Sequence, residues 1–300
     1  MVWNASNSLF CLALVAATGS AMAQTAPAVS EINGKADYAG GTMDGYEGHN
    51  FSGSITLPVC QAIGFQADGL YSHIGDADFY GGAGHLFWRN PDLGLVGLTG
   101  GYLYREGVDT FQVGAEGQYY IGPVTLGVFA GVGQINYAHS ASFIDTNPTR
   151  FIGRVSADYY PINDLRIGVS YTTAFADNLG RAELEYQTPI RGLALTAEAS
   201  LGNHGYDDLL FGVRYYFGAK KSLRDRQRQD DPPGFMQQVL QGLGLYGAEY
   251  NRKLNAYVKS LGGQGGSYGS YSYYGSVSET IVVQAVPPIV MPNSNTRYRQ

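Results

Sequence analysis

The chain has 300 residues and a formal net charge of −6, and only 15% of its residues are charged, against about 25% in soluble domains. Glycine (42 residues) and tyrosine (24 residues) are abundant. No run of about 18 apolar residues is present, which excludes a membrane-spanning helix. This composition suits strands that face lipid on one side and pack tightly on the other.

The N-terminus carries an export signature. An apolar run at Leu9–Ala17 is followed by Ala21-Met22-Ala23, an A-x-A pattern that predicts cleavage between Ala23 and Gln24. No Lys or Arg precedes the run, which departs from the usual signal pattern. Residues 1–23 are therefore predicted to be a signal peptide. The alternative is an apolar terminus without an export role.

Residues 24–218 are predicted to form the barrel domain. From Ile32 to Phe217, segments of about ten residues alternate between apolar and polar side chains, as in residues 110–121, TFQVGAEGQYYI. A period of two places the two sets on opposite faces of a strand. The sequence predicts an all-β, antiparallel up-and-down barrel of twelve strands, with 10–14 compatible. The predicted strands are 31–38, 49–58, 61–72, 78–88, 93–105, 109–121, 124–137, 150–160, 164–173, 179–188, 192–201 and 208–217.

The arrangement of charges and aromatics favours a membrane barrel over a soluble one. The polar faces hold charges of both signs with glycine and serine, as expected of a lumen. Aromatic residues gather near both ends of the strands, where Tyr side chains meet the membrane–water interface. One rim is predicted to hold Tyr119, Tyr159, Tyr186, Tyr215 and Phe217, and the other Tyr38, Tyr71, Phe79, Tyr104, Phe111, Tyr137, Phe151 and Tyr171.

The connections between strands predict an orientation. Every second connection is short and carries a proline, at Pro58, Pro91, Pro123, Pro161 and Pro189. Proline fixes φ and donates no ladder bond, so it fits a tight turn. The other connections are predicted to be longer: 39–50, 72–76, 106–109, 139–149, 174–178 and 202–207. In such barrels the short turns are periplasmic and the long loops extracellular. An even number of strands leaves both termini of the chain in the periplasm.

The last strand, with Phe211, Val213, Tyr215 and Phe217 on one face, resembles the terminal signature by which outer-membrane barrels are recognised for insertion. Together with the signal, the alternation and the aromatic rims, it resembles the Gram-negative outer-membrane β-barrel superfamily. The resemblance implies an outer-membrane location, and as partners membrane lipid, lipopolysaccharide and the barrel-insertion machinery. It extends to no particular member, so no family site is carried over.

Composition changes at Ala219. The segment 219–300 carries a net charge of +5 against −11 for the rest. It is predicted to be a mostly disordered periplasmic tail, with a short amphipathic helix possible at 235–261 and a Gly/Ser/Tyr low-complexity stretch at 262–276. The glycines Gly242, Gly244 and Gly247 weaken the helix prediction. The tail is expected to contact the cell wall or a periplasmic protein, and no nucleic acid.

Twelve charged residues on the polar faces are predicted to line the lumen. Neighbouring strands could pair these charges and fill the interior, or leave them along a wet pore. Twelve strands lie between the filled eight-stranded barrels and the open 16–18-stranded channels, so both outcomes are compatible. The predicted lumen residues are Lys35, Asp37, Asp68, Glu116, Arg154, Asp158, Arg166, Arg181, Glu183, Glu185, Glu198 and Arg214.

Ten acids gather in the predicted outer loops or at their edges. Such a mouth would concentrate cations and repel anions. The alternatives are solubility and divalent-cation bridging to anionic surface lipid. The acids are Asp44, Glu47, Asp76, Asp78, Glu106, Asp109, Asp145, Asp177, Asp207 and Asp208.

Three functions follow in order of preference: a small porin-like channel for passive diffusion of small, preferably cationic solutes; a plugged structural or surface-interaction barrel; and a surface hydrolase. Four histidines, His49, His73, His139 and His204, lie at the predicted outer rim. No nucleophile elbow G-x-S-x-G and no metal-ligand spacing accompany them. The sequence therefore predicts no enzyme, no catalytic or metal site and no cofactor.

Overall fold

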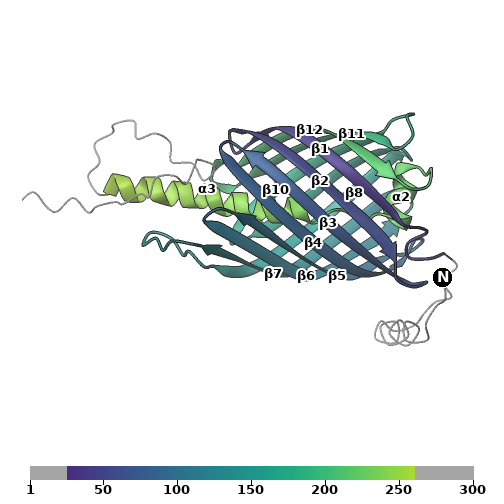
Figure 1. The fold of residues 1–300 in the computed structure, drawn as a ribbon, viewed down its shortest axis with the longest axis horizontal. Coiled ribbons are helices and arrows are strands. Elements are labelled where there is room, and N and C mark those ends of the chain that lie inside the picture. The colour runs from purple at the N-terminus through teal and green to yellow at the C-terminus, as the bar shows by residue number, and fades with distance from the viewer. Residues whose placement is uncertain (1–25, 261–300) are drawn as a thin grey trace, which may run out of the picture.

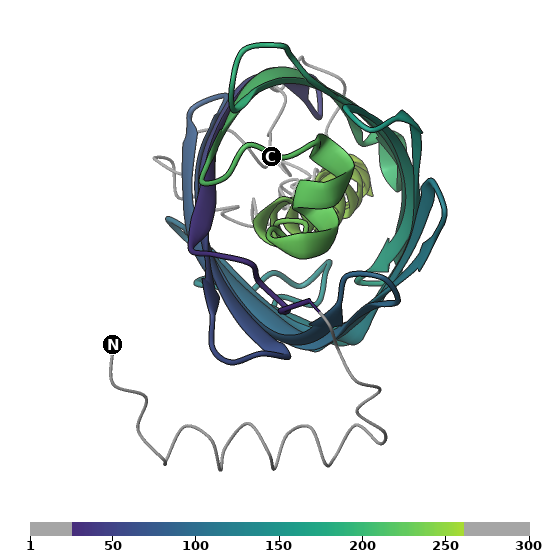
Figure 2. The ribbon, with the colours of Figure 1, turned by 90° about the vertical axis from the view of Figure 1, so that its right-hand side faces the viewer.

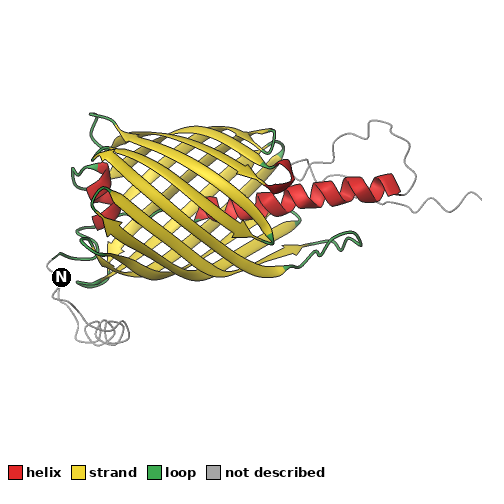
Figure 3. Ribbon diagram, turned by 180° about the vertical axis from the view of Figure 1, so that it is seen from behind, coloured by secondary structure: helices red, strands yellow, loops and turns green. Residues whose placement is uncertain are grey.

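A computed structural model describes residues 26–260 of the chain. The predicted signal peptide and the low-complexity stretch 262–276 lie outside the described residues. Twelve antiparallel strands close into a barrel, with β1 paired to β12, and two helices follow (Figures 1 and 3). The strands are β1 (Asn33–Met43), β2 (Tyr46–Pro58), β3 (Ile63–Ile74), β4 (Ala77–Asn90), β5 (Gly94–Arg105), β6 (Val108–Ile121), β7 (Val124–Tyr137), β8 (Thr149–Ile162), β9 (Leu165–Ala174), β10 (Asp177–Gln187), β11 (Leu193–Gly202) and β12 (Asp207–Phe217).

The helices are α2 (Leu223–Gln229), α3 (Met236–Ser260) and a short 3-10 turn, η1 (Asn203–Gly205). Ser222 caps α2 by accepting a hydrogen bond from the backbone N–H of Asp225. Within residues 26–260, neither helix is long and apolar enough to cross a bilayer.

The outer face of the barrel is apolar, as the alternation predicts. On β6, Phe111, Val113 and Tyr119 are exposed, while Thr110 and Gln112 are buried towards the interior. Exposed aliphatic and aromatic side chains recur around the barrel on every strand pair. A closed barrel with an apolar exterior satisfies all its backbone groups in lipid. The chain is therefore an outer-membrane β-barrel protein.

Two residues predicted for the aromatic rims face the other way. Phe79 is fully buried inside the barrel, and Tyr137 stacks on Tyr250 of α3 with 5.3 Å between ring centroids. Both follow the inward alternation of their strands, and both pack on apolar neighbours in the lumen. The insertion-signal residues Phe211, Val213, Tyr215 and Phe217 all point outwards on β12.

The predicted difference in connection length is wrong for most loops. We define the turn end of the barrel by connections 59–62, 91–93, 122–123, 163–164 and 188–192. We define the loop end by connections 44–45, 75–76, 106–107, 138–148, 175–176 and 203–206. Only 138–148 is long. The strands extend through the predicted loops: residues 39–50, for example, are a hairpin whose ladder pairs Ala39 with Asn50 and Met43 with Tyr46.

The segment predicted as a periplasmic tail enters the barrel instead. The helix expected at 235–261 is present as α3, but it lies along the lumen, as the view down the barrel shows (Figure 2). Val239, Leu240, Leu243 and Leu245 of α3 are at most 1% exposed and belong to one apolar cluster with the inner wall. The prediction placed this helix outside the barrel because nothing in the tail alone shows which surface covers its apolar face.

Candidate functional site

The lumen is divided into two zones. The zone towards the loop end is mainly apolar, although Arg105, Gln112 and Asp208 are also buried there. The zone towards the turn end is charged. In the apolar zone, inward side chains of the wall meet the buried face of α3, and most have no accessible surface. These wall residues are Met43, Ile74, Phe79, Leu103, Ile135, Ile152, Phe175, Leu179, Tyr206 and Leu210. Little water can therefore reach the surface between these side chains and α3.

Glycines bring the wall and helix close together. A Cβ atom at Gly202 of β11 would lie 2.6 Å from Cδ2 of Leu245, closer than atoms pack. On the helix, a Cβ atom at Gly242 would lie 2.7 Å from Nε2 of Gln112 on β6. Gly242 thus permits the close approach of α3 to the wall.

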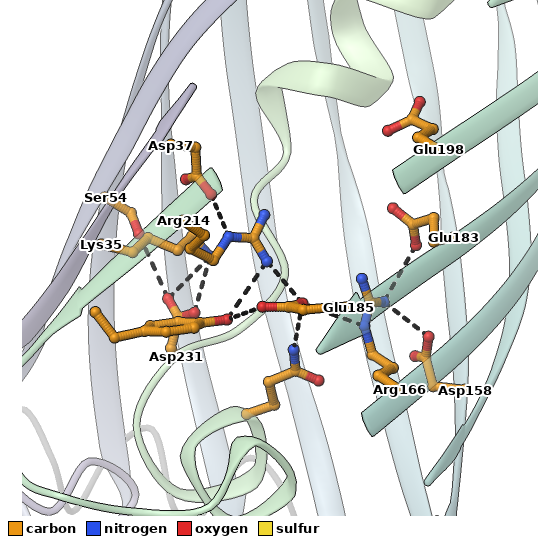
Figure 4. Close-up of polar contacts among 12 residues, drawn as sticks. Lys35, Asp37, Ser54, Asp158, Arg166, Glu183, Glu185, Glu198, Arg214 and Asp231 are labelled. Carbon is orange, nitrogen blue, oxygen red and sulfur yellow. Dashed lines mark hydrogen bonds and ion pairs between the residues drawn. The ribbon is translucent and has the colours of Figure 1, made fainter. Parts of the chain in front are cut away.

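The charged zone pairs arginines with carboxylates across six strands (Figure 4). Arg166 donates to Asp158 at 2.9 Å and to Glu183 at 3.1 Å. Glu185, which is fully buried, accepts from Arg214 at 2.8 Å and from the Tyr216 hydroxyl at 2.6 Å. Each charge has opposite charges as neighbours, which offsets part of the cost of leaving water.

The network continues on both sides. Arg181 pairs with Glu183 and with Glu198, the latter at 2.7 Å. Arg214 also pairs with Asp37 on β1. Arg154 lies beside this network and lines a cavity of about 150 Å³. That cavity has room for several waters but is bounded by α3 on the loop side.

A second charged group lies on β3, β4 and β6. The buried His85 ring contacts Asp68 at 3.0 Å and Glu116 at 2.9 Å. Asp68 also accepts from the backbone N–H of Phe235, just before α3, at 2.9 Å. The group therefore holds the start of α3. The sequence did not indicate His85, because apolar residues on both faces of β4, such as Phe79 and Tyr80, hide the alternation.

Ten of the twelve residues predicted to line the lumen fall into these two groups, while Arg154 lies beside the first group and Lys35 pairs with a residue of the C-terminal segment. The helical segment adds further partners that the sequence did not indicate. Asp231, in the link between α2 and α3, accepts two hydrogen bonds from Lys35 at 2.9 and 3.0 Å. Gln241 of α3 donates to Glu198 at 2.7 Å and to Asp208 at 3.2 Å. The segment is held by polar contacts as well as apolar packing.

The ten predicted mouth acids all lie at the loop end, but they are not alike. Glu47, Asp76, Asp78, Glu106, Asp145 and Asp207 are exposed, and Asp44 and Asp109 are half-buried. Asp177 and Asp208 are buried, the first against His204 at 2.9 Å and the second against the Tyr206 hydroxyl at 2.9 Å. Burial and, second, the charge of Asp207 raise the pKa of Asp44 to about 7.

Comparison with known proteins gives matches in fold only. No protein-family model matches the chain, and no curated protein matches it. The solved structures that it resembles include the KdgM porin (12% identity, TM-score 0.46) and the same porin in complex with disordered oligogalacturonate (12%, 0.47). Each of these matches covers 61% of this chain and 99% of the porin.

An outer-membrane channel from Pseudomonas putida F1 is also similar, at 12% identity and a TM-score of 0.43, over 66% of this chain and 98% of the channel. Likeness at this level carries no conclusion about what passes through, or binds to, this barrel.

Proposed function

We propose that this protein is an outer-membrane barrel that its own C-terminal segment keeps closed, and that it serves as a membrane anchor and interaction platform rather than as an open diffusion pore. The observation that carries the proposal is the apolar inner wall at the loop end. A diffusion pore presents polar side chains to the water in its lumen. Here the wall residues are apolar and meet the apolar face of α3.

The free energy of apolar burial favours a helix that stays in the lumen over one that enters it only from time to time. Removing α3 would expose its own buried face and the wall together. Burial of one large apolar side chain contributes about 1.5–3 kcal/mol, and at least ten such side chains of the wall lie in this cluster. An empty lumen would therefore be strongly disfavoured in water.

The charged zone supports the same proposal. A wet pore needs charges that remain available to passing ions. In this zone Arg166, Arg181 and Arg214 each contact at least two carboxylates, and these groups have little exposed surface. Their pairing links the strands to one another.

Planar-bilayer recording of the full chain tests the proposal. Inserted protein should be electrically silent at low voltage. Stable ohmic conductance steps from the full chain would overturn it. Insertion is checked independently by the shift in gel mobility that folded barrels show on heating.

The second candidate is a porin-like channel that conducts only when α3 moves. The observation that favours it is the cavity of about 150 Å³ in the charged zone, which displacement of α3 would join to the loop end. The exposed acids at that end would then favour small cations. Cation-selective conductance appearing only in variants that release α3 would support this candidate.

A hydrolase is not part of the proposal. At the loop end, His49 contacts Glu47, His73 contacts Asp78 and His204 contacts Asp177. These contacts explain three of the four loop-end histidines without a nucleophile. Membrane lipid, lipopolysaccharide and the insertion machinery remain the partners we propose. A periplasmic partner for the whole tail is not proposed, because part of that tail lies in the lumen.

A further inference from the structure

We propose that the chain passes through its own barrel, so that the sequence after Ser260 starts on the extracellular side of the outer membrane. This inference rests on the proposed closure of the lumen by the C-terminal segment. It adds a function: the barrel carries its own C-terminus to the cell surface.

The segment enters the lumen at the turn end. After β12, the backbone N–H of Arg224 donates to the carbonyl of Asn163, in the turn between β8 and β9, at 2.9 Å. Arg228 donates to the carbonyl of Val124 at 2.8 Å, beside the turn between β6 and β7. These contacts fix α2 across the turn end, where it lies at the right of Figure 1.

The link and the start of α3 then cross the charged zone. Asp231 binds Lys35, and the backbone of Phe235 donates to Asp68 in the middle of β3. One turn and a half later, Gln241 reaches Glu198 on β11. The chain therefore moves steadily along the barrel axis rather than turning back.

The helix leaves at the loop end. Leu245 packs against Gly202, the last residue of β11. The Tyr246 hydroxyl donates to the carbonyl of Asp145 in the long loop 138–148. Further along, Tyr257 stacks on Phe143 of the same loop with 5.5 Å between ring centroids.

The length of α3 is consistent with a helix that leaves the lumen at the loop end. Its 25 residues span about 37 Å at 1.5 Å per residue, longer than the apolar band of about 25 Å, and it starts inside the lumen. In Figure 1 its yellow-green end projects past the strands at the left. There Arg252, Asn255, Lys259 and Ser260 are exposed and polar, which suits water rather than lipid.

The orientation follows from the barrel itself. The twelve strands are even in number, so Asn33 and Phe217 lie at the same end, the turn end. Barrel chains reach the outer membrane from the periplasm, and an even number of strands leaves both termini of the barrel on that side. The loop end, with its long loop 138–148 and its exposed acids, is then extracellular.

An epitope tag after Gln300 of the full chain tests the inference in intact cells. Two matched controls carry the same tag between Gly122 and Pro123 at the turn end, or within loop 138–148. Antibody should bind the C-terminal tag as well as the loop tag, and the turn tag only after permeabilisation. Binding of the C-terminal tag only after permeabilisation would overturn the inference, and so would failure of the loop tag in intact cells.

Trypsin gives a second readout without any tag. Added to intact cells, it should cut after the exposed Arg252 or Lys259, while the exposed Arg191 in the turn 188–192 should stay intact. Cleavage at Arg191 but not at Lys259 would overturn the inference. Conductance tests the closure of the lumen separately from the passage of the chain through it. A silent protein with a periplasmic C-terminus would be closed but not threaded. A conducting protein with its C-terminus at the cell surface would be threaded but not closed.

Discussion

Replacing Val239 and Leu243 together with aspartate is expected to release α3 from the lumen. The two residues are four positions apart, so they share one face of the helix. Both have no accessible surface, and both belong to the apolar cluster of the loop-end zone. The double variant therefore places two carboxylates inside this buried apolar cluster.

The magnitude can be worked from burial. Six large apolar side chains between Phe235 and Leu245 are at most 4% exposed, and at about 1.5–3 kcal/mol each they contribute on the order of 10 kcal/mol. A displaced helix would then occur in about one molecule in ten million, since about 1.4 kcal/mol is tenfold. These side chains are Phe235, Met236, Val239, Leu240, Leu243 and Leu245.

The two aspartates remove about 4 kcal/mol of this burial and add several kcal/mol for each unpaired carboxylate. The sum is again on the order of 10 kcal/mol, enough to bring closed and displaced states to comparable populations. Repulsion between like charges at i and i+4 adds a few tenths of a kcal/mol in the same direction.

Single-channel recording is the assay, with Asn251→Asp/Asn255→Asp as the matched control. The control adds the same two charges at the same spacing in the C-terminal part of α3, where Asn251 is half-buried and Asn255 exposed. The Val239→Asp/Leu243→Asp protein should show frequent openings, and the native and control proteins none. A folded, inserted double variant that stays silent would refute the idea that apolar packing holds α3 in place.

Three further predictions concern single residues. Lys35→Met should destabilise the closed barrel by about 3–5 kcal/mol in urea unfolding, because it leaves a buried carboxylate of the α2–α3 link without its cation; no loss would contradict the pairing. Gly242→Val should raise the frequency of channel openings in single-channel recordings, because its Cβ atom would press on Gln112. An unchanged opening frequency would show that the helix has room at this position. Burial, and to a smaller extent the charge of Asp207, raises the pKa of Asp44 to about 7. The folded protein therefore binds the proton of this carboxyl group more tightly than the unfolded chain does. Native stability should therefore fall as pH rises from about 4 to about 7 relative to Asp44→Asn, a residue that tolerates the positive φ there; parallel pH profiles would exclude this role.

The exterior and strand number could be predicted because lipid imposes a strict rule on one face. From Phe111 to Ile121 every second residue of β6 is apolar, whatever happens inside, and the same holds for the outward residues of β12 from Leu209 to Phe217. The predicted charges also lie in the lumen, because a charge on the lipid face costs several kcal/mol near the bilayer centre. These features depend on each strand alone.

The filling of the lumen could not be predicted in the same way, because it depends on residues far apart in sequence. Phe79 and Ile135 are apolar on the inward face, and the alternation alone gave no reason for this. Gly242 weakened the helix prediction, yet it is the residue that allows α3 to approach Gln112. His85 was missed because its strand is apolar on both faces.

The apolar inner wall and the position of α3 in the lumen, neither of which was predicted, have one physical cause. It relates the number of strands to the C-terminal segment. Eight strands leave an interior that their own side chains can fill, and twelve leave more. A helix is about 10–12 Å across with its side chains, so it can occupy such a space where side chains of the wall cannot meet. An apolar helix then requires an apolar wall opposite it, which is what β4, β5, β7 and β8 supply through Phe79, Leu103, Ile135 and Ile152. Apolar residues on the inward face of a membrane barrel therefore indicate that a segment of protein, and not water, lies against them.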